Sequence, residues 1–535
     1  MMANQIVLRR TAHGVCLLLP LLAAPAWGLA AEWPQWGGRN DRNMVSPEKG
    51  LPDDFALGSK RSDGSGIDMA TTRHVRWVVR LGSQTYGTPT VAGGRVYVGT
   101  NDFALDDPKY TPTKGGLLKC LDEATGKLLW QLVIPRLESH EKTFNFDNMD
   151  LGLCCSPTVD GDRVYVVTNR CEVLCLDVHG MANGNDGPFL DEGQYCVGPG
   201  KPPVTPGSTD ADILWQFDML HDLPVQPHDA ACCSVLVLGD MVYVCTSNGV
   251  EKGGARVPLP LAPSLIVLEK KTGRLVAADE EQIGTRLFHG QWSSPAVAEV
   301  NGRSLILFGA GDGVCYAFEP VREVPLRPVP LHKVWWCDCN PPQYKVHDGK
   351  PIGYWTGDIR RHLGNNGDGT FASPSEIIAT PVFHDNRVYV AVGQDPRHGR
   401  GRGVLTCIDA TGSGEVTERG KLWTYDGVER TLSTVAIAGG LLYLPDLAGQ
   451  IHCLDAQTGQ CLWVHRTGAE AWGSTLVVDG RVYLGTAKSL WVLASGRELK
   501  MLHEYRPGAP LWCSPVAANG TLYLASQRYL WAIAP

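Results

Sequence analysis

Two pairs of adjacent cysteines, Cys154-Cys155 and Cys232-Cys233, are the most chemically distinctive feature of the 535-residue chain. A disulfide between neighbouring residues closes a small ring that departs from ordinary disulfide geometry, so such a bond is strained and easily reduced. A redox-active bond is therefore one interpretation of each pair. The other interpretation is two buried thiols that pack as small apolar side chains.

Side chains that bind metals lie close to the second cysteine pair. His228 precedes Cys232 by four residues, and His289 follows further along the chain. Imidazole and thiolate groups are ligands of copper and zinc. Together with Cys513, the two histidines are a candidate site for such a metal, although their spacing matches no diagnostic metal motif.

The elements that position these residues follow from a repeat. A small hydroxyl residue, an apolar stretch, a turn and a Val-Tyr-Val-like strand recur eight times, in residues 88–98, 156–166, 234–244, 294–307, 380–390, 434–444, 474–484 and 514–524. In the last three copies the tyrosines Tyr443, Tyr483 and Tyr523 are 40 residues apart. That period is typical of one blade of a β-propeller.

A second signature follows each copy and is clearest in residues 120–130 and 453–463. There an Asp-x-x-Thr-Gly turn joins two strands, and the second strand carries a tryptophan. Each repeat thus supplies four short strands with alternating side chains, which form one antiparallel blade. We expect an all-β fold, an eight-bladed β-propeller of four-stranded antiparallel blades.

The two ends of the chain predict how the ring closes. The eighth copy stops after its third strand at residues 530–533, and a strand with the missing tryptophan occurs at residues 74–78. Pairing these segments makes residues 74–535 a single propeller that follows an N-terminal extension, residues 32–73. Glycine- and aspartate-rich insertions at residues 179–212 and 340–376 are too long for blade turns.

Composition and the N-terminus indicate an ordered, exported protein. Apolar residues make up 44% and charged residues 19%, which excludes a disordered chain. A net charge of −8 without a basic tract argues against nucleic acid as a partner. Residues 1–31 have the basic start, short apolar run and small-residue exit of a signal peptide cleaved near Ala30. We expect a periplasmic monomer without a membrane span.

The Asp-x-x-Thr-Gly-x-x-x-Trp signature around eight blades resembles the tryptophan-docking motif of the quinoprotein alcohol dehydrogenase-like propellers. That superfamily contains dehydrogenases that use pyrroloquinoline quinone (PQQ) and scaffolds such as the outer-membrane assembly propeller. The chain is also similar to exported bacterial PQQ-like repeat proteins that open with a Trp-Pro-Gln-Trp phrase, here residues 33–36. Because catalysts and scaffolds share this fold, the resemblance leaves open whether the protein is an enzyme.

In such a ring the first strand of each blade lines the central channel, so residues just before each hydroxyl position converge at one mouth. One step before it stand Cys155, Cys233 and Cys513, and two steps before it stand Cys154, Cys232, Trp292, Trp472 and Trp512. Flat aromatic faces suit a planar cofactor or a sugar. The alternative is that these side chains only fill the hole that eight blades leave open.

The resemblance implies roles for individual residues. PQQ dehydrogenases carry a Cys-Cys pair that packs on PQQ, and Cys154-Cys155 matches its position by blade count. They also hold Ca²⁺ with a glutamate in the third blade, near the position of Glu251. We find no counterpart of their asparagine ligand or aspartate base, and Cys232-Cys233 is an addition to their pattern.

Two functions therefore remain open. The first is a periplasmic quinoprotein-like redox protein, an alcohol or sugar dehydrogenase, that binds PQQ with calcium, or a related planar ligand, at the channel mouth. The second is a non-catalytic scaffold for a cell-envelope protein or polysaccharide, similar to the outer-membrane assembly propeller.

Overall fold

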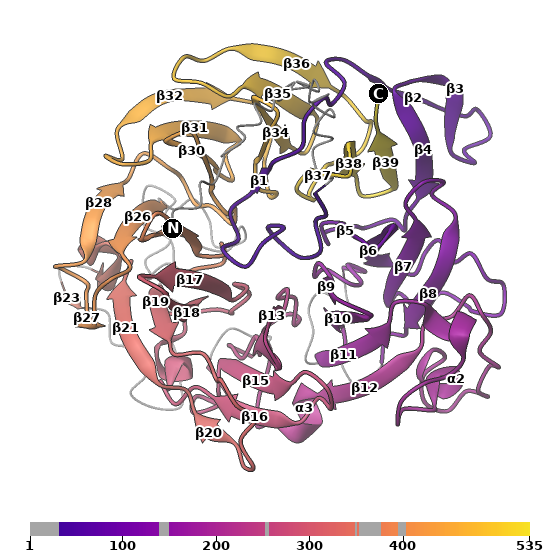
Figure 1. The fold of residues 1–535 in the computed structure, drawn as a ribbon, viewed down its shortest axis with the longest axis horizontal. Coiled ribbons are helices and arrows are strands. Elements are labelled where there is room, and N and C mark those ends of the chain that lie inside the picture. The colour runs from indigo at the N-terminus through magenta and orange to yellow at the C-terminus, as the bar shows by residue number, and fades with distance from the viewer. Residues whose placement is uncertain (1–30, 138–148, 252–255, 348–349, 352–375, 394–402) are drawn as a thin grey trace, which may run out of the picture.

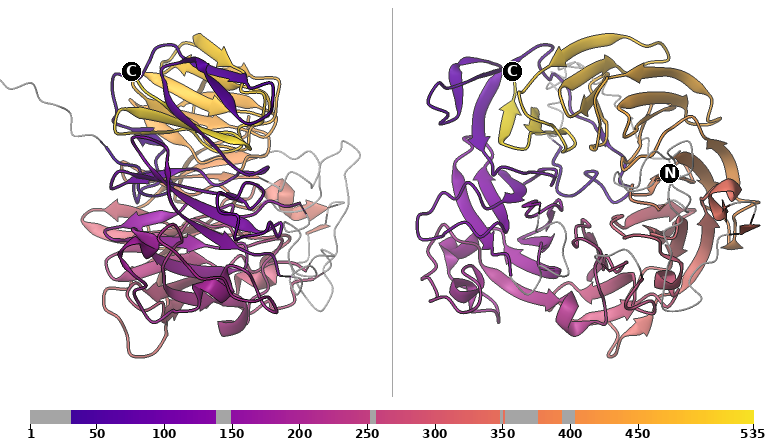
Figure 2. Two further views of the ribbon diagram at one scale, coloured as in Figure 1. Left: turned by 90° about the vertical axis from the view of Figure 1, so that its right-hand side faces the viewer. Right: turned by 180° about the vertical axis from the view of Figure 1, so that it is seen from behind.

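Eight sheets follow one another around a central channel, as Figure 1 shows, so the predicted eight-bladed propeller is confirmed. The computed structural model describes residues 31–137, 149–251, 256–347, 350–351, 376–393 and 403–535. The predicted signal peptide lies almost entirely outside these residues, as does most of the insertion at 340–376. The left view of Figure 2 shows the ring edge-on as a thick disc, and the face-on view of Figure 1 shows the strands of each blade following one another from the channel outward.

The first four blades each run outward from a short inner strand. Blade 1 contains β5 Thr90–Ala92, β6 Arg95–Asn101, β7 Gly116–Asp122 and β8 Leu128–Ile134. Blade 2 contains β9 Thr158–Asp160, β10 Arg163–Val167, β11 Glu172–Asp177 and β12 Ile213–Asp218. Blade 3 contains β13 Leu236–Leu238, β14 Met241–Cys245, β15 Leu265–Glu269 and β16 Leu275–Ala278. Blade 4 contains β17 Ala296–Val300, β18 Arg303–Gly309, β19 Val314–Phe318 and β21 Lys333–Asp338.

The other four blades repeat this order and close the ring. Blade 5 contains β24 Val382–His384, β25 Arg387–Val392, β26 Val404–Asp409 and β28 Lys421–Tyr425. Blade 6 contains β29 Ala436–Ala438, β30 Leu441–Pro445, β31 Gln450–Asp455 and β32 Cys461–Arg466. Blade 7 contains β33 Leu476–Val478, β34 Arg481–Gly485, β35 Leu490–Ala494 and β36 Met501–Tyr505. Blade 8 contains β37 Val516–Ala518, β38 Thr521–Ala525, β39 Tyr529–Ile533 and, from the N-terminal side, β4 Val75–Arg80. Because β39 pairs antiparallel with β4, the predicted closure is confirmed.

The remaining elements are short. Two hairpins are formed by β2 Ala56–Lys60 with β3 Ile67–Arg73 and by β22 Val346–His347 with β23 Lys350–Pro351. Single strands add to blades 7, 3 and 4, namely β1 Val45–Ser46, β20 Val329–Pro330 and β27 Gly414–Glu415. The helices in the described ranges are η2 Gly180–Asn183, α2 Glu192–Tyr195, α3 Met219–Asp222, η3 Ile283–Arg286 and η4 Pro342–Lys345.

Tryptophans on the outer strands join neighbouring blades. The Trp77 indole Nε1 donates a 2.9 Å hydrogen bond to the Glu123 carbonyl in the Thr-Gly turn of blade 1. A Cβ added at Gly126 in that turn would lie 2.7 Å from the Trp77 ring. Equivalent indole bonds run from Trp130 to Val178, from Trp215 to Lys270 and from Trp463 to Gly496. The signature therefore docks each of these tryptophans on the turn of the next blade.

A belt of hydroxyl residues surrounds the channel. In six blades, the backbone N–H of the hydroxyl residue donates to the hydroxyl oxygen of the next blade, over 2.8–3.1 Å. One such step joins Ser474 to Ser514, and another joins Ser514 to Thr88 across the ring closure. The recurrent Ser or Thr of the repeat thus holds the inner strands together.

The N-terminal extension crosses the channel and seals one end of it. Figure 1 shows this segment running across the middle of the ring. Within it, residues 31–46 hydrogen-bond to the inner edge of every blade, through Val91, Val159, Val235, Val297, Phe383, Ile437, Val477 and Ala517. The extension is therefore the floor of the channel, and among the described residues the channel above this floor has the form of a cup.

Candidate functional site

Above this floor the described residues enclose a cavity of about 190 Å³, which we call the central cup. All eight residues that stand two steps before the hydroxyl positions line it, namely Tyr86, Cys154, Cys232, Trp292, Ile378, Leu432, Trp472 and Trp512. Seven of the eight hydroxyl residues form a second layer beneath them. Successive residues of an extended strand are about 3.3 Å apart, so the repeat places the two layers at different depths.

Aromatic side chains dominate one side of the cup. The ring centroids of Trp472 and Trp512 are 5.3 Å apart, and those of Tyr86 and Trp472 are 5.9 Å apart. Trp36, from the sealing extension, also lines the cup and donates its indole N–H to Thr380 Oγ1 over 3.0 Å. Nothing in the sequence around Trp36 indicates that the extension enters the channel, so its place in the cavity is known only from the structure.

The cysteine pairs are divided between the cup and its wall. Cys154 and Cys232 line the cup, whereas the Cys155 thiol lies 3.0 Å from the Val167 carbonyl and the Cys233 thiol 3.4 Å from that of Cys245. Cys513 likewise turns into the wall, 3.4 Å from the Gly87 carbonyl. Alternation along an extended strand explains this split.

Burial keeps three of these thiols protonated, those of Cys155 and Cys233 in the wall and that of Cys232 at the cup. It raises the pKa of Cys155 and of Cys233 to about 12, and it raises the pKa of Cys232 well above the usual thiol range. Since the thiolate is the nucleophile and the metal ligand, these cysteines are poorly suited to either role at neutral pH. Their surroundings agree with the interpretation of packed thiols.

The described lining of the cup fits only part of PQQ. Its aromatic faces match a flat ring system, but no described residue that lines the cup carries a charge. Burying the carboxylates of PQQ without a cation would be strongly unfavourable. We therefore find that the described residues do not fit this cofactor as a whole.

A second group of side chains gathers behind Trp292. His228, Asp229 and His289 each direct one possible ligand atom to a common point, with these atoms within 4.8 Å of one another. All three are buried. The structure thus brings the two predicted histidines together, but with Asp229 in the group. Asp229 was missed as a ligand although it follows His228 directly.

Glu251, the predicted calcium ligand, is bound to an arginine. Its carboxylate Oε2 lies 3.1 Å from Arg256 Nε, and its backbone N–H donates to the Arg256 carbonyl. The neighbouring Val250 carbonyl contacts His228, so Glu251 lies next to the histidine group in the chain. A calcium ion held by Glu251 would have to displace the guanidinium.

Three carboxylates meet where the first insertion leaves blade 2. Asp177, Asp186 and Asp212 approach within 4.8 Å, and Asp212 is fully buried. Burial, together with the negative charges of Glu192 and its two neighbours in the group, raises the pKa of Asp212 from 3.8 to about 6.

Asp212→Asn is expected to make the protein more stable at pH 7, by about 3 kcal/mol, since each unit of pKa shift corresponds to about 1.4 kcal/mol. Between pH 4 and 6 the folded carboxyl retains a proton that the unfolded chain has lost, so wild-type stability falls as pH rises through this window. Below pH 4 the two proteins should be equally stable. Urea unfolding with a chelator present checks this. Asp162→Asn, at a surface carboxylate, is the control, and a gain that does not change with pH would contradict the prediction.

Among the solved structures that resemble this chain, one with a TM-score above 0.5 shows the same fold. A europium-containing methanol dehydrogenase has 13% identity and a TM-score of 0.54, over 93% of this chain and 89% of that one. BamB from Moraxella catarrhalis has 12% identity and a TM-score of 0.48 over 86% and 99% of the chains. The quinohemoprotein alcohol dehydrogenase from Comamonas testosteroni has 11% identity and a TM-score of 0.48, over 94% of this chain and 80% of that one. No curated protein matches the sequence.

In the described ranges, none of the helices is long and apolar enough to cross a membrane.

The sequence itself identifies the family. The profile of the PQQ_2 family, described as outer membrane protein assembly factor BamB, matches residues 106–322 and 401–528, which is more than half of the chain. The protein therefore belongs to the PQQ_2 family of β-propellers.

Proposed function

We propose that this exported propeller binds a small flat ring in its central cup, as a quinoprotein-like redox protein does with its quinone. The observation that carries the proposal is the set of four aromatic side chains, Tyr86, Trp292, Trp472 and Trp512, around a cavity with a sealed floor. Stacking on such faces selects planar ligands, and the hydroxyl layer offers hydrogen bonds beneath them.

The size and polarity of the cup narrow the ligand class. Its volume of about 190 Å³ is below the roughly 300 Å³ at which pockets for drug-sized ligands begin. A ligand of one or two fused rings with little charge fits this space. A neutral quinone and a single sugar ring belong to this class. PQQ with calcium is larger and anionic, so it tests whether the cup also binds a ligand outside this class.

Trp472→Leu is expected to weaken binding of such a ligand by 10- to 100-fold, since stacking on one aromatic side chain contributes roughly 1–3 kcal/mol. Leucine is tolerated at this place because Leu432 occupies the equivalent position in blade 6. The measurement is calorimetric titration of the purified protein with a neutral naphthoquinone, with glucose and with PQQ plus Ca²⁺.

The matched control is Trp491→Leu, because Trp491 lies on β35 away from the cup and packs on His465. It should leave binding unchanged. If none of the three ligand types binds at millimolar concentration, or if both variants weaken binding equally, the proposed function is wrong. Tight binding of PQQ alone would instead favour a true quinoprotein.

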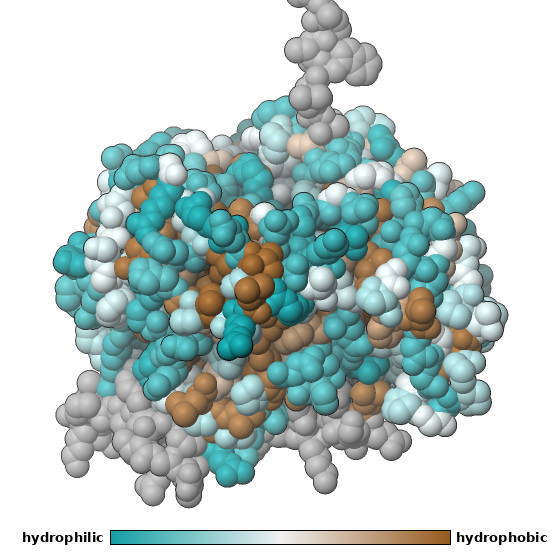
Figure 3. Space-filling model, turned by 60° about the horizontal axis from the view of Figure 1, so that its bottom comes forward, coloured by the Kyte–Doolittle hydropathy of each residue, from teal (hydrophilic) through white to brown (hydrophobic). Residues whose placement is uncertain are grey.

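A scaffold function is the second candidate, and exposed apolar side chains favour it. The segment leading to β20, which pairs with β16 on the outer edge of blade 3, carries Leu326 with 98% of its surface exposed. Figure 3 shows several apolar groups among the mostly hydrophilic ones on the face turned to the viewer. A cell-envelope protein is the partner that such a surface suits, in the periplasm that the N-terminal residues predict.

Leu326→Ser discriminates between the two functions. In a scaffold, this change should remove a specific envelope protein from the material retained by the immobilised chain, with ligand binding in the cup unaffected. If the two chains retain the same proteins, the exposed leucine has no such role.

A further inference from the structure

We propose that His228, Asp229 and His289 bind a divalent transition-metal ion, with zinc as the expected occupant, in the wall of the central cup behind Trp292. This site is separate from the proposed ring-binding function and does not depend on it. The two histidines come from different blades. His228 and Asp229 precede β13 of blade 3, and His289 precedes β17 of blade 4.

The geometry of the three side chains matches a metal site. Their exposed fractions are 4%, 4% and 6%, and His228 Nε2 lies 3.6 Å from Asp229 Oδ2. Two ligands about 2.1 Å from a tetrahedral zinc ion are about 3.4 Å apart. The observed separation therefore needs only a small adjustment to admit the ion.

Hydrogen bonding prepares His228 as a ligand. Its Nδ1 lies 2.7 Å from the Val250 carbonyl oxygen, which can only accept a hydrogen bond. The ring is thus held with the N–H at Nδ1 and the lone pair at Nε2, on the side of Asp229. In metal-binding histidines, the ring nitrogen that does not bind the metal usually donates a hydrogen bond, often to a backbone carbonyl.

Asp229 has features that a bound cation explains. Its φ of +61° is rare for a residue other than glycine, and such conformations concentrate at functional sites. Its Oδ1 is buried and has no hydrogen-bond partner among the residues that the structure describes. A buried carboxylate oxygen without a donor is unfavourable unless a cation lies against it.

The chain between the blades brings the two imidazoles together. Their ring centroids are 4.1 Å apart, and Val250 donates its N–H to the His289 carbonyl. A Cβ at Gly249 would lie 2.7 Å from both His228 Cβ and the His289 carbonyl oxygen. Only glycine at this position allows so close an approach.

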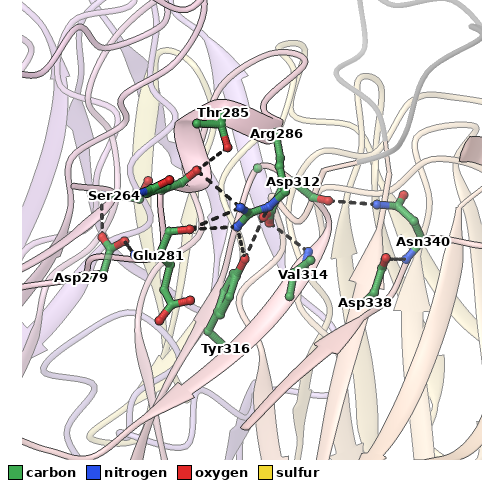
Figure 4. A network of polar contacts seen from close by, with 12 residues as sticks. Ser264, Asp279, Glu281, Thr285, Arg286, Asp312, Val314, Tyr316, Asp338 and Asn340 are labelled. Carbon is green, nitrogen blue, oxygen red and sulfur yellow. Dashed lines mark hydrogen bonds and ion pairs between the residues drawn. The ribbon is translucent and has the colours of Figure 1, made fainter. Parts of the chain in front are cut away.

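A buried polar network fixes the segment that carries His289. Figure 4 shows Arg286, at the end of η3, held by Asp312 and Tyr316 of blade 4. The Arg286 guanidinium lies 2.9 Å from Asp312 Oδ2 and 2.7 Å from the Tyr316 hydroxyl. Gln291 then ties the same segment to the Asn248 carbonyl over 2.9 Å. These contacts hold His289 in place before any ion binds.

Trp292 separates the three ligands from the cup. Its indole N–H donates a 3.0 Å hydrogen bond to the Ala230 carbonyl. The centroid of its ring lies 5.3 Å from that of His289 and 6.0 Å from that of His228. An apolar cover of this kind strengthens metal–ligand bonds by excluding water. Three protein ligands leave the fourth position of a zinc ion for water or another oxygen donor.

The test is a titration of the chelator-treated full chain with Co²⁺, which reports its coordination by visible absorption. We expect one ion per chain, the spectrum of four-coordinate cobalt, and its displacement by Zn²⁺. Asp229→Asn and His289→Gln should each weaken binding at least 100-fold. His452→Gln is the matched control, because His452 is a buried histidine 3.0 Å from Asp446 that belongs to no described three-ligand group.

A measurement on the unaltered protein covers the case in which the variants fail to fold. Anomalous diffraction from wild-type crystals soaked in Zn²⁺ should place one peak among the three side chains. A peak elsewhere, such as at the cysteine pairs, would overturn the proposal. So would no binding at micromolar Zn²⁺, since the 3.6 Å contact between His228 and Asp229 would then serve only to hold the two side chains together.

Discussion

Arg42→Met is expected to lower the free energy of unfolding by about 4 kcal/mol, because several charge-assisted hydrogen bonds are lost at a fully buried position. The Arg42 guanidinium donates to the carbonyls of Val235 and Pro295 in two blades and to the Trp36 carbonyl, over 2.6–3.1 Å. Burial lowers its pKa to about 9. A methionine leaves these carbonyls without a donor and loosens the floor of the cup.

Arg39→Met is the control, since Arg39 belongs to the same segment but is 53% exposed and makes one ion pair with Asp41. Exposed pairs contribute about 0–1 kcal/mol, so this variant should unfold almost as the wild type does. Guanidinium denaturation measures both. Limited proteolysis should cut residues 31–50 faster in the Arg42 variant alone. Equal stability of the two variants would mean that the floor does not depend on Arg42.

Gly126→Ala is expected to destabilise the protein by about 3 kcal/mol, through two effects. The φ of Gly126 is +71°, a region that costs other residues about 1–2 kcal/mol. In addition, the new methyl group would lie 2.7 Å from the docked Trp77 ring, so the tryptophan must move off the turn.

Gly480→Ala separates the two effects. Gly480 has a φ of +72°, but nothing lies within 4 Å of an added Cβ. Gly480→Ala should therefore lower the free energy of unfolding only by the cost of a positive φ at alanine, about 1 kcal/mol. Thermal unfolding of both variants gives the difference, which measures tryptophan docking. Equal losses would show that docking contributes little to stability.

The sequence by itself determined the ring and its inner lining. The hydroxyl phrase and the Asp-x-x-Thr-Gly turn are local patterns, and copies of the hydroxyl phrase follow one another at intervals of 40 to 86 residues. Each copy therefore marks the same position in its blade. Counting back two steps from each hydroxyl residue predicts that Cys154, Trp292 and Trp472 meet, and all three line the central cup. The count was wrong for the residues one step back, Cys155, Cys233 and Cys513, which face the wall. The closing pair of β4 and β39 followed from the same count.

The tertiary structure alone decided what lies off this repeat. Residues 31–46 have no period of their own, and all but one of the inner strands that they contact lie more than 100 residues away, so their role as the floor was not predictable. Side chains alternate along a strand, so one cysteine of each pair must face the wall, and the orientation of the strand in the ring makes it Cys155 and not Cys154. His228 and Asp229 meet His289 only because blades 3 and 4 are neighbours and Gly249 lets their loops touch. Repetition encodes a blade, but contacts made once between distant segments appear only when the ring has closed.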